Sequence, residues 1–347
     1  DGTQAAHERL SAQPPPLGRE ERAFARALVG RTLDHPDMPA PVRLECPAWA
    51  WDRLDPAERE AELAALLGEA PFDLRTNTLV TDRDALLERL RAEGLEAEPT
   101  RYSPLGVRLP ERLPVGGREW FREGAAEVQD EGSQLIALLT GARPGEAVAD
   151  FCAGAGGKTL ALAAAMDNTG QLVACEVMEP RLNRARERFK RAGVHNVRTQ
   201  TLKHEADPWV KKHRGRYDRV LVDAPCSNLG TWRRNPDARW RTDGGALDDL
   251  FKRQKKILAS AARLVKPGGR LVYATCSMLP EENERQAEAF LEKQAGTFVP
   301  APVGSLWAEF SSQPPPCPDP WLRLTPARHA TDGFFAACFQ RVPETGE

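Results

Sequence analysis

The sequence predicts an α/β protein whose main domain is a doubly wound, mostly parallel sheet. From residue 144 to 342, short apolar runs alternate with amphipathic helical segments, which is typical of a parallel sheet covered on both faces. A glycine-rich turn follows the first apolar run, where such sheets place a ligand. A small α+β module is expected at residues 71–143, preceded by a helical segment at residues 1–70.

Composition limits the class of protein. With 347 residues, the chain can form two or three domains, and 41% hydrophobic with 28% charged residues is ordinary for a globular protein. No apolar run is long enough to cross a membrane, so no membrane partner is expected. Seven scattered cysteines without Cys-x-x-Cys spacing, and no export signal, favour reduced thiols in the cytoplasm and argue against a metal site. We expect a monomer.

The main domain is expected to contain five strands of a parallel sheet and two further strands at one edge. The five predicted strands are Ala147–Phe151, Gln171–Glu176, Asn196–Thr201, Tyr217–Val222 and Arg270–Thr275. Helices are predicted at Gly157–Met166, Arg181–Arg191 and Leu247–Leu264, and antiparallel edge strands at Leu322–Thr325 and Phe334–Phe339.

The small module reads as strand, helix, strand, strand. Its predicted strands are Phe72–Leu79, Leu95–Tyr102 and Gly106–Leu109, with a strand pair at Trp120–Gln129. A helix that Thr81-Asp82 can cap and that Gly94 closes follows the first strand. A module of this kind resembles a ferredoxin-like or RNA-recognition-like fold, but it lacks the aromatic stacking signature of RNA recognition.

The glycine-rich turn, DFCAGAGGKT at residues 150–159, joins the first predicted strand to its helix. Its glycines let the backbone approach a ligand, and Glu176 at the end of the second strand can accept hydrogen bonds from ribose hydroxyls. The spacing departs from Gly-x-Gly-x-x-Gly, which disfavours a nicotinamide dinucleotide, and Cys152 breaks the phosphate-binding P-loop pattern. An ordinary glycine-rich connection remains the alternative for this turn alone.

Two thiols and an acid follow two later strands. Asp223 and Cys226 end the strand Tyr217–Val222, and Cys276 ends the strand Arg270–Thr275. A chemistry that needs this set is alkylation of a pyrimidine at C5: a thiolate adds at C6 and makes C5 nucleophilic. An acid at N3 would stabilise the charge on the ring, and a second group would help remove the C5 proton and expel the thiol.

Three motifs then identify a resemblance to a known family. DFCAGAGGKT (150–159), VDAPCS (222–227) and YATCSMLPEEN (273–283) resemble the signatures of the Nop/Sun-type RNA cytosine-5 methyltransferases. Within that family the chain is similar to the bacterial 16S ribosomal RNA methyltransferase B branch. Supporting matches are LRTN (74–77), VQDEGSQ (128–134), RRNPD (233–237) and DGFF (332–335). The resemblance covers residues 71–341 and implies a Rossmann-like methyltransferase domain that uses S-adenosylmethionine.

The resemblance implies a role for each matching residue. Cys276 would attack C6, Cys226 would assist release of the methylated base, Asp223 would contact the cytosine, and Lys158 would position groups in the same pocket. The residues implied to hold S-adenosylmethionine are Cys152, Ala153, Gly154, Ala155, Gly156, Gly157 and Lys158, together with Glu176 and Asp223.

Two positions depart from the family pattern. Ala155 stands where the family usually has proline, which keeps the backbone donors of the loop. Leu202 stands where the family usually has an aspartate beside the adenine of the cofactor. The adenine contact is therefore open between Glu205, Asp207 and apolar side chains.

Charge is unevenly distributed although the net charge is only −2. Residues 181–219 contain thirteen Lys and Arg against four Asp and Glu, and a second basic group spans residues 233–241. These groups could bind RNA, or could be solvated helix faces and a structural loop. We expect rRNA as the partner, with tRNA, a non-catalytic RNA-binding scaffold and a nicotinamide-dependent oxidoreductase as alternatives.

Overall fold

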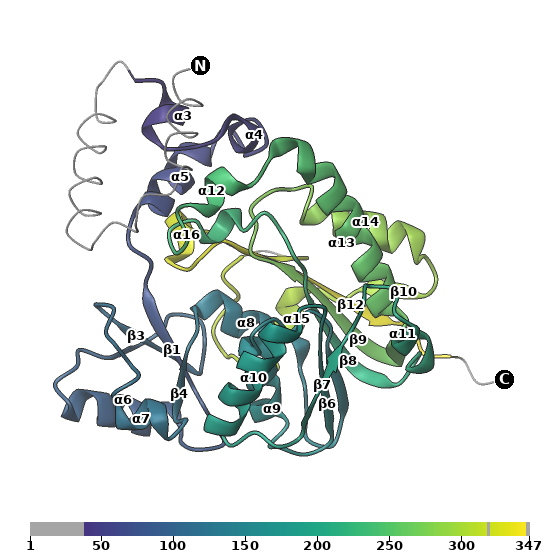
Figure 1. The fold of residues 1–347 in the computed structure, drawn as a ribbon, viewed down its shortest axis with the longest axis horizontal. Coiled ribbons are helices and arrows are strands. Elements are labelled where there is room, and N and C mark those ends of the chain that lie inside the picture. Colours follow the sequence, from purple (N-terminus) through teal and green to yellow (C-terminus); the bar gives the residue numbers. More distant parts are fainter. Residues whose placement is uncertain (1–37, 318–319, 345–347) are drawn as a thin grey trace. The chain divides into compact units, whose positions relative to one another are not determined.

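The computed structural model of the protein describes residues 38–317 and 320–344 (Figure 1). The chain divides into two units, residues 1–52 and 53–347, which we describe separately. The described part of the first unit contains two single-turn helices, α3 (Ala40–Arg43) and α4 (Ala48–Trp51). Residues 1–37 of the predicted helical segment lie outside the described residues.

The second unit is built around an eight-stranded sheet. Its strand order is β10-β12-β9-β8-β5-β6-β7, with β11 paired to β12. The strands β5 to β9 are parallel, and the edge strands β10, β11 and β12 are antiparallel, as the sequence predicts for the tail. The strand bounds are β5 (Ala147–Asp150), β6 (Gln171–Glu176), β7 (Val197–Thr201), β8 (Tyr217–Asp223), β9 (Val265–Thr275), β10 (Phe298–Pro300), β11 (Leu322–Leu324) and β12 (Phe334–Arg341).

Helices cover both faces of this sheet (Figure 1). The longer ones are α8 (Glu131–Thr140), α9 (Gly157–Ala165), α10 (Glu179–Arg191), α13 (Leu247–Ala262) and α14 (Glu284–Lys293). The other helices of this unit outside the small module are α5 (Arg59–Leu67), α11 (Pro208–Lys212), α12 (Ala238–Arg241), α15 (Val303–Trp307), α16 (Pro326–His329) and the 3₁₀ turns η1 (Leu229–Thr231) and η2 (Gly244–Ala246). None of the helices in the described ranges has the length and apolar character that a membrane span requires.

Successive side chains of the central strands pack alternately into two separate hydrophobic clusters. In β8, Val220 and Val222 pack in the cluster that contains Ile257 of α13, whereas Leu221 packs in the cluster that contains Leu162 of α9. Successive side chains of a strand point to opposite faces, so a continuous apolar run is what a strand buried on both faces requires. The structure therefore confirms the doubly wound sheet that the apolar runs of the sequence predict.

The small module forms an antiparallel sheet of order β2-β3-β1-β4. Its elements are β1 (Phe72–Thr76), α6 (Arg83–Ala92), β2 (Glu98–Pro99), β3 (Gly106–Leu109), α7 (Glu119–Arg122) and β4 (Ala126–Val128). The side chain of Asp82 caps α6 by accepting a 2.8 Å hydrogen bond from the amide of Ala85, as predicted. This is the ferredoxin-like α+β arrangement that the sequence predicts.

Two predictions for this module are wrong in detail. The strand pair expected at Trp120–Gln129 is the helix α7 followed by the single strand β4. Gly124 separates them with φ +75°, and a Cβ there would lie 2.2 Å from the carbonyl oxygen of Arg191, so the chain must turn at a glycine. The strand expected at Leu95–Tyr102 shrinks to the two residues of β2, which contain Pro99, a residue without an amide proton for the ladder.

A buried ion cluster joins the small module to the main domain. Asp332 binds Nε of Arg233 at 2.7 Å and also binds Nε of Arg234. A second nitrogen of Arg234 reaches Asp130 at 2.8 Å and the carbonyl oxygen of Pro71 at 3.2 Å. Asp130 in turn caps α8 through the amide of Gly132. Three supporting motifs, VQDEGSQ, RRNPD and DGFF, therefore meet in one structural joint.

Replacing Asp332 with Ala should destabilise the protein strongly. The side chain of Asp332 is 2% exposed, and its loss leaves Arg233 without the carboxylate that it binds. Removing one partner of a buried ion pair costs about 3–5 kcal/mol. Urea unfolding of the variant should show this loss, whereas Asp249→Ala, which breaks an exposed pair with Lys252, should change the unfolding free energy by less than about 1 kcal/mol. Equal losses in both variants would contradict the assignment.

Candidate active site

The candidate site lies at the carboxyl ends of β5, β6, β8 and β9. The strand order reverses at β5, which pairs with β6 on one side and β8 on the other. Open α/β sheets bind ligands in the crevice at such a reversal. Asp150, Glu176 and Asp223 are the last residues of their strands, and Cys276 follows the last residue of β9. The topology thus brings all the predicted site residues to the carboxyl end of the central strands.

The two predicted thiols are in direct contact. Sγ of Cys226 lies 3.3 Å from Sγ of Cys276, and both residues are partly accessible to solvent. The hydrogen bond with Cys276, followed by burial, raises the pKa of the Cys226 thiol well above its ordinary value. Cys226 therefore holds its proton more strongly than an ordinary thiol while Cys276 lies beside it.

A buried carboxylate holds the two thiol-bearing turns together. Glu282 is fully buried and accepts hydrogen bonds from the amide of Ser227 at 2.8 Å and from its hydroxyl at 2.6 Å. Nε2 of Gln254 on α13 donates to the same carboxylate at 3.0 Å. The hydroxyls of Ser227 and Ser277, each next to one of the cysteines, lie 3.1 Å apart. Sequence reasoning missed this clamp, although Glu282 lies within the third motif.

Lys158 and Asp223 form an ion pair beside the thiols. Nζ of Lys158 lies 2.7 Å from Oδ2 of Asp223, and the lysine side chain is 10% exposed. Burial by itself lowers the pKa of Lys158, but the charge and hydrogen bond of Asp223 outweigh it, so the net pKa is raised. The charge interaction with Cys276 acts on the Lys158 pKa in the same direction. The pair therefore supplies a fixed positive charge and a carboxylate at one point of the site.

The glycine-rich loop is held open by Glu176. Oε2 of Glu176 accepts a 3.0 Å hydrogen bond from the amide of Gly154, and Oε1 accepts from the amides of Val177 and Met178. Gly154 has φ +55°, and a Cβ added there would meet nothing within 4 Å, so the loop faces open space. A carboxylate has about four acceptor positions, which leaves capacity for a ligand hydroxyl. Burial raises the pKa of Cys152 well above its ordinary value, so its thiol stays protonated.

Three further side chains at this edge bear on cofactor binding. Oδ1 of Asp150 is buried and has no hydrogen-bond partner in the described part of the chain. Burial raises the pKa of Asp150 to about 7, against the hydrogen bond from Thr159. Val177 and Met178, directly after Glu176, are 40% and 50% exposed, whereas Leu202 is 2% exposed and packs in the core. Leu202 therefore presents no surface to a ligand, and the exposed apolar pair does.

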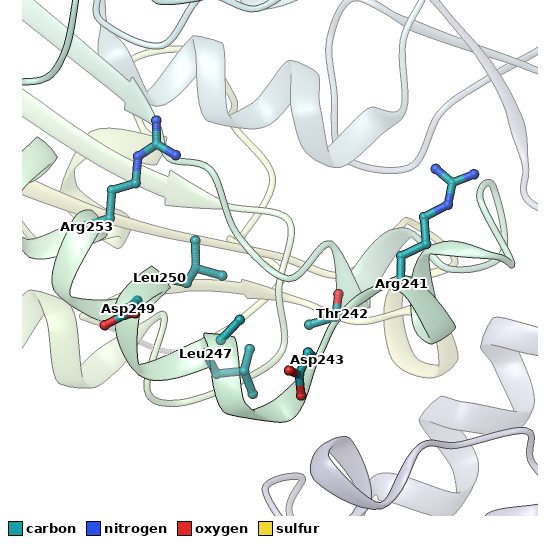
Figure 2. Close-up of a pocket in the computed structure, with 8 residues that line it drawn as sticks. Arg241, Thr242, Asp243, Leu247, Asp249, Leu250 and Arg253 are labelled. Carbon is teal, nitrogen blue, oxygen red and sulfur yellow. The ribbon is translucent and has the colours of Figure 1, made fainter. Parts of the chain in front are cut away.

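A pocket of about 410 Å³ lies along the start of α13. Figure 2 shows Arg253 and Arg241 at its two ends, with Leu247 and Leu250 between them. Arg253 makes no hydrogen bond or ion pair within the described ranges, and its charge acts to lower the pKa of Cys152 in the loop. The pocket thus joins an unpaired cation to the neighbourhood of the glycine-rich loop.

Much of the second basic group is structural. Arg233 and Arg234 bind Asp332, and Arg239 is 2% exposed with its guanidinium 5.4 Å from the ring centre of Trp232. Trp232 itself is 1% exposed. The structural-loop alternative therefore holds for these residues, and Trp240 and Arg241 remain at the surface. No three His, Cys, Asp or Glu side chains of the described residues gather as a metal site would require.

The contact between the thiols predicts how Cys226 titrates. Replacing Cys276 with Ala removes the largest cause that raises the Cys226 pKa, so that pKa should fall. The rate of alkylation of Cys226 by iodoacetamide, followed by peptide mass spectrometry across pH, should rise at a lower pH than in the unmodified protein. Cys338→Ala, a buried thiol on β12, is the matched control. An unchanged Cys226 profile in Cys276→Ala would contradict the coupling.

Comparison with known proteins identifies two matching families. Residues 137–340 match the family described as 16S rRNA methyltransferase RsmB/F, and residues 46–116 match the ferredoxin-like domain of RsmF/B-like methyltransferases. The ribosomal RNA small subunit methyltransferase B of Citrobacter koseri is 34% identical over 84% of this chain. A probable methyltransferase B of Synechocystis is 33% identical over 89% of this chain and 70% of its own length.

Solved structures agree with this. A methyltransferase homologue from Pyrococcus horikoshii superposes with a TM-score of 0.73 at 28% identity, covering 87% of this chain and 98% of its own. The NSun6 protein of the same organism has a TM-score of 0.74 at 19% identity and covers 86% of this chain and 99% of its own, which supports the fold.

This chain spans 65% of the length of the Citrobacter relative. Its catalytic-domain match covers the parallel sheet with both thiol-bearing turns, and the resemblance read from the three motifs is confirmed at the level of the family. The chain belongs to the RsmB/F family of S-adenosylmethionine-dependent 16S rRNA methyltransferases.

Proposed function

We propose that this protein methylates C5 of a cytosine in RNA through a covalent bond between Cys276 and C6 of the base. The observation that carries the proposal is the 3.3 Å contact between two thiols beside the Lys158–Asp223 ion pair. A protein that only bound RNA would have no use for two thiols in contact at a sheet edge where ligands bind. The non-catalytic scaffold is therefore the weaker alternative.

Cys276 is the proposed nucleophile. Its thiolate forms a bond to C6. The electron pair of the C5–C6 double bond shifts to form a C4–C5 double bond, and the pair of the C4–N3 double bond moves onto N3. The resulting enamine is nucleophilic at C5. Lys158 interacts electrostatically with Cys276. The proton shared between Lys158 and Asp223 can be donated to N3 of the base, where charge develops as the adduct forms.

Cys226 is the proposed releasing group. After C5 carries the methyl group, a base must take the C5 proton so that the C5–C6 double bond reforms and the C6–sulfur bond breaks. Bonding to C6 turns the Cys276 sulfur into a neutral thioether, which removes the main cause of the raised Cys226 pKa. Cys226 therefore becomes easier to ionise at the step that needs a base.

The cofactor loop and Glu176 fit S-adenosylmethionine, which supplies an electrophilic methyl group when bound. The open face of Gly154 and the remaining acceptor position of Glu176 suit a ribose hydroxyl. The exposed Val177 and Met178 suit an adenine ring, which favours the apolar alternative over Glu205 and Asp207.

The pocket at the start of α13 suits the RNA chain next to the target base. Arg253 and Arg241 provide positive charge for phosphates, and the partly exposed Leu250 provides an apolar surface for a base. Two carboxylates of the pocket are engaged locally: Asp249 binds Lys252, and Asp243 accepts from the amide of Gly245. They therefore oppose a polyanion less than their number suggests.

Small-subunit rRNA is the proposed target. The relatives with 33–34% identity carry the name ribosomal RNA small subunit methyltransferase B, and the family model names 16S rRNA. A tRNA remains the second candidate because the catalytic chemistry does not depend on the RNA that carries the cytosine. A ribosomal target agrees with the cytoplasmic location expected from the reduced thiols.

Replacing each cysteine should give a different outcome. Cys276→Ala should abolish methyl transfer, because no thiolate can add to C6. Cys226→Ala should instead accumulate a protein–RNA adduct that survives denaturing electrophoresis, because release is blocked. Cys317→Ala, another partly accessible thiol, should behave as the unmodified protein. Normal turnover by Cys276→Ala would contradict the proposed roles.

The target is tested by bisulfite sequencing of total RNA from a strain lacking the gene. We expect a cytosine of 16S rRNA to lose its C5 methyl group and to regain it when the intact gene, but not a Cys276→Ala copy, is restored. Loss at a tRNA cytosine alone would favour the tRNA alternative. If no cytosine loses methylation, the proposed function is wrong.

A further inference from the structure

Asn228 lies against both thiols of the candidate site. Its Oδ1 is 3.2 Å from Sγ of Cys276 and 3.9 Å from Sγ of Cys226. The contact with Cys276 is the shorter of the two and lies well inside the range of a hydrogen bond to sulfur. Neither the motif comparison nor the chemistry of cytosine methylation singles out this residue.

The backbone around Asn228 fixes where the amide points. Asn228 has φ +57° and ψ +22°, the left-handed conformation that asparagine tolerates better than most residues. Its carbonyl oxygen accepts hydrogen bonds from the amide and the hydroxyl of Thr231, each at 3.0 Å. Two residues on, the amide of Gly230 donates to the carbonyl oxygen of Cys276 at 3.0 Å. The turn is thus tied directly to the residue that its side chain contacts.

Gly230 is also wedged against the start of β12. Its carbonyl oxygen accepts from the amide of Gly333 at 2.8 Å, and a Cβ on Gly230 would lie 2.2 Å from the carbonyl oxygen of Gly333. No side chain larger than hydrogen fits at this contact. The Asn228 turn is therefore held between β9 and β12 and cannot move away from the thiols without disturbing both strands.

The carboxamide can serve either protonation state of a thiol. Its oxygen accepts a hydrogen bond from S–H, and its NH₂ group donates to S⁻ after a half-turn about the last side-chain bond. Within the described residues, no other hydrogen bond holds the side-chain nitrogen of Asn228, so this half-turn breaks no further contact. The bond to the charged sulfur is the stronger of the two, so the amide favours the thiolate overall.

We propose that Asn228 is a further catalytic residue, whose side-chain amide aims the Cys276 sulfur by accepting from its thiol and donating to its thiolate. The inference rests on the proposed role of Cys276 as the nucleophile. It gives the Cys276 sulfur a neutral hydrogen-bonding partner in addition to the charged Lys158.

The φ of Asn228 determines which substitutions are informative. Asn228→Gly removes the amide and keeps the left-handed turn without strain, because glycine adopts positive φ freely. Asn228→Asp keeps the shape and the acceptor but replaces the donor with a negative charge, which repels a thiolate. Asn168→Gly is the matched control: Asn168 also has positive φ (54°) and precedes β6 at the opposite end of the sheet.

The experiment is iodoacetamide labelling of Cys276 in the full chain, read by peptide mass spectrometry at a series of pH values. Asn228→Gly should label about tenfold more slowly at neutral pH, the value of one hydrogen bond to a charged group. The deficit should disappear at alkaline pH, where every thiol is ionised. Asn228→Asp should label more slowly still, and Asn168→Gly should match the unmodified protein.

Two results would overturn the inference. One is a Cys276 labelling profile in Asn228→Gly that equals that of the unmodified protein. The other is an equal slowing in Asn168→Gly, which would mean that the loss of any left-handed asparagine has this effect. Labelling needs neither RNA nor cofactor, so it tests the role of Asn228 independently of the proposed function. The proposed function would fail separately, if the unmodified protein transferred no methyl group to RNA.

Discussion

The geometry of the candidate site depends on the buried carboxylate of Glu282. Two loops separated by fifty residues must bring two sulfur atoms to 3.3 Å, and thiols themselves attract each other only weakly. Glu282 holds the two loops together, because its buried carboxylate accepts hydrogen bonds from Ser227 and from Gln254. Next to it, Asn283 accepts from Thr275 and donates to the carbonyl oxygen of Ser277. The turn after β9 is thus fixed on both sides.

The four supporting motifs, LRTN, VQDEGSQ, RRNPD and DGFF, are chiefly architectural. Asp130, Arg234 and Asp332 come from three of them and form one buried ion cluster. The fourth contributes Arg75, which donates to Gln129, and Asn77, whose amide bridges the carbonyl oxygens of Gly124 and Ala192. Buried charges persist only when they are paired, so each of these residues needs the others. The small module is consequently a fixed part of the same unit as the catalytic sheet.

Charge separates the roles of two chemically identical thiols. Cys276 interacts electrostatically with Lys158, whereas the pKa of Cys226 is raised by its hydrogen bond with Cys276 and by burial. Only one of two adjacent thiols ionises easily, because a second negative charge at contact distance is unfavourable. In the proposed mechanism the same pair supplies first a nucleophile and later a base.

The sequence by itself determined the doubly wound sheet and the end of the sheet on which the site lies, and it predicted Asp223, Cys226 and Cys276 as site residues. These follow from local signals: apolar runs, a glycine-rich turn and residues at strand ends. The sequence misplaced α7 as a strand, because a short segment with Trp120 and Phe121 has no decisive period, and only the contact at Gly124 decides it. Only the tertiary structure could reveal Glu282, Asn228, the ion pairs of Arg233 and Arg234, and the burial of Arg239. Whether a polar side chain meets a distant partner or solvent depends on packing between segments far apart in the chain, and local pattern carries no record of it.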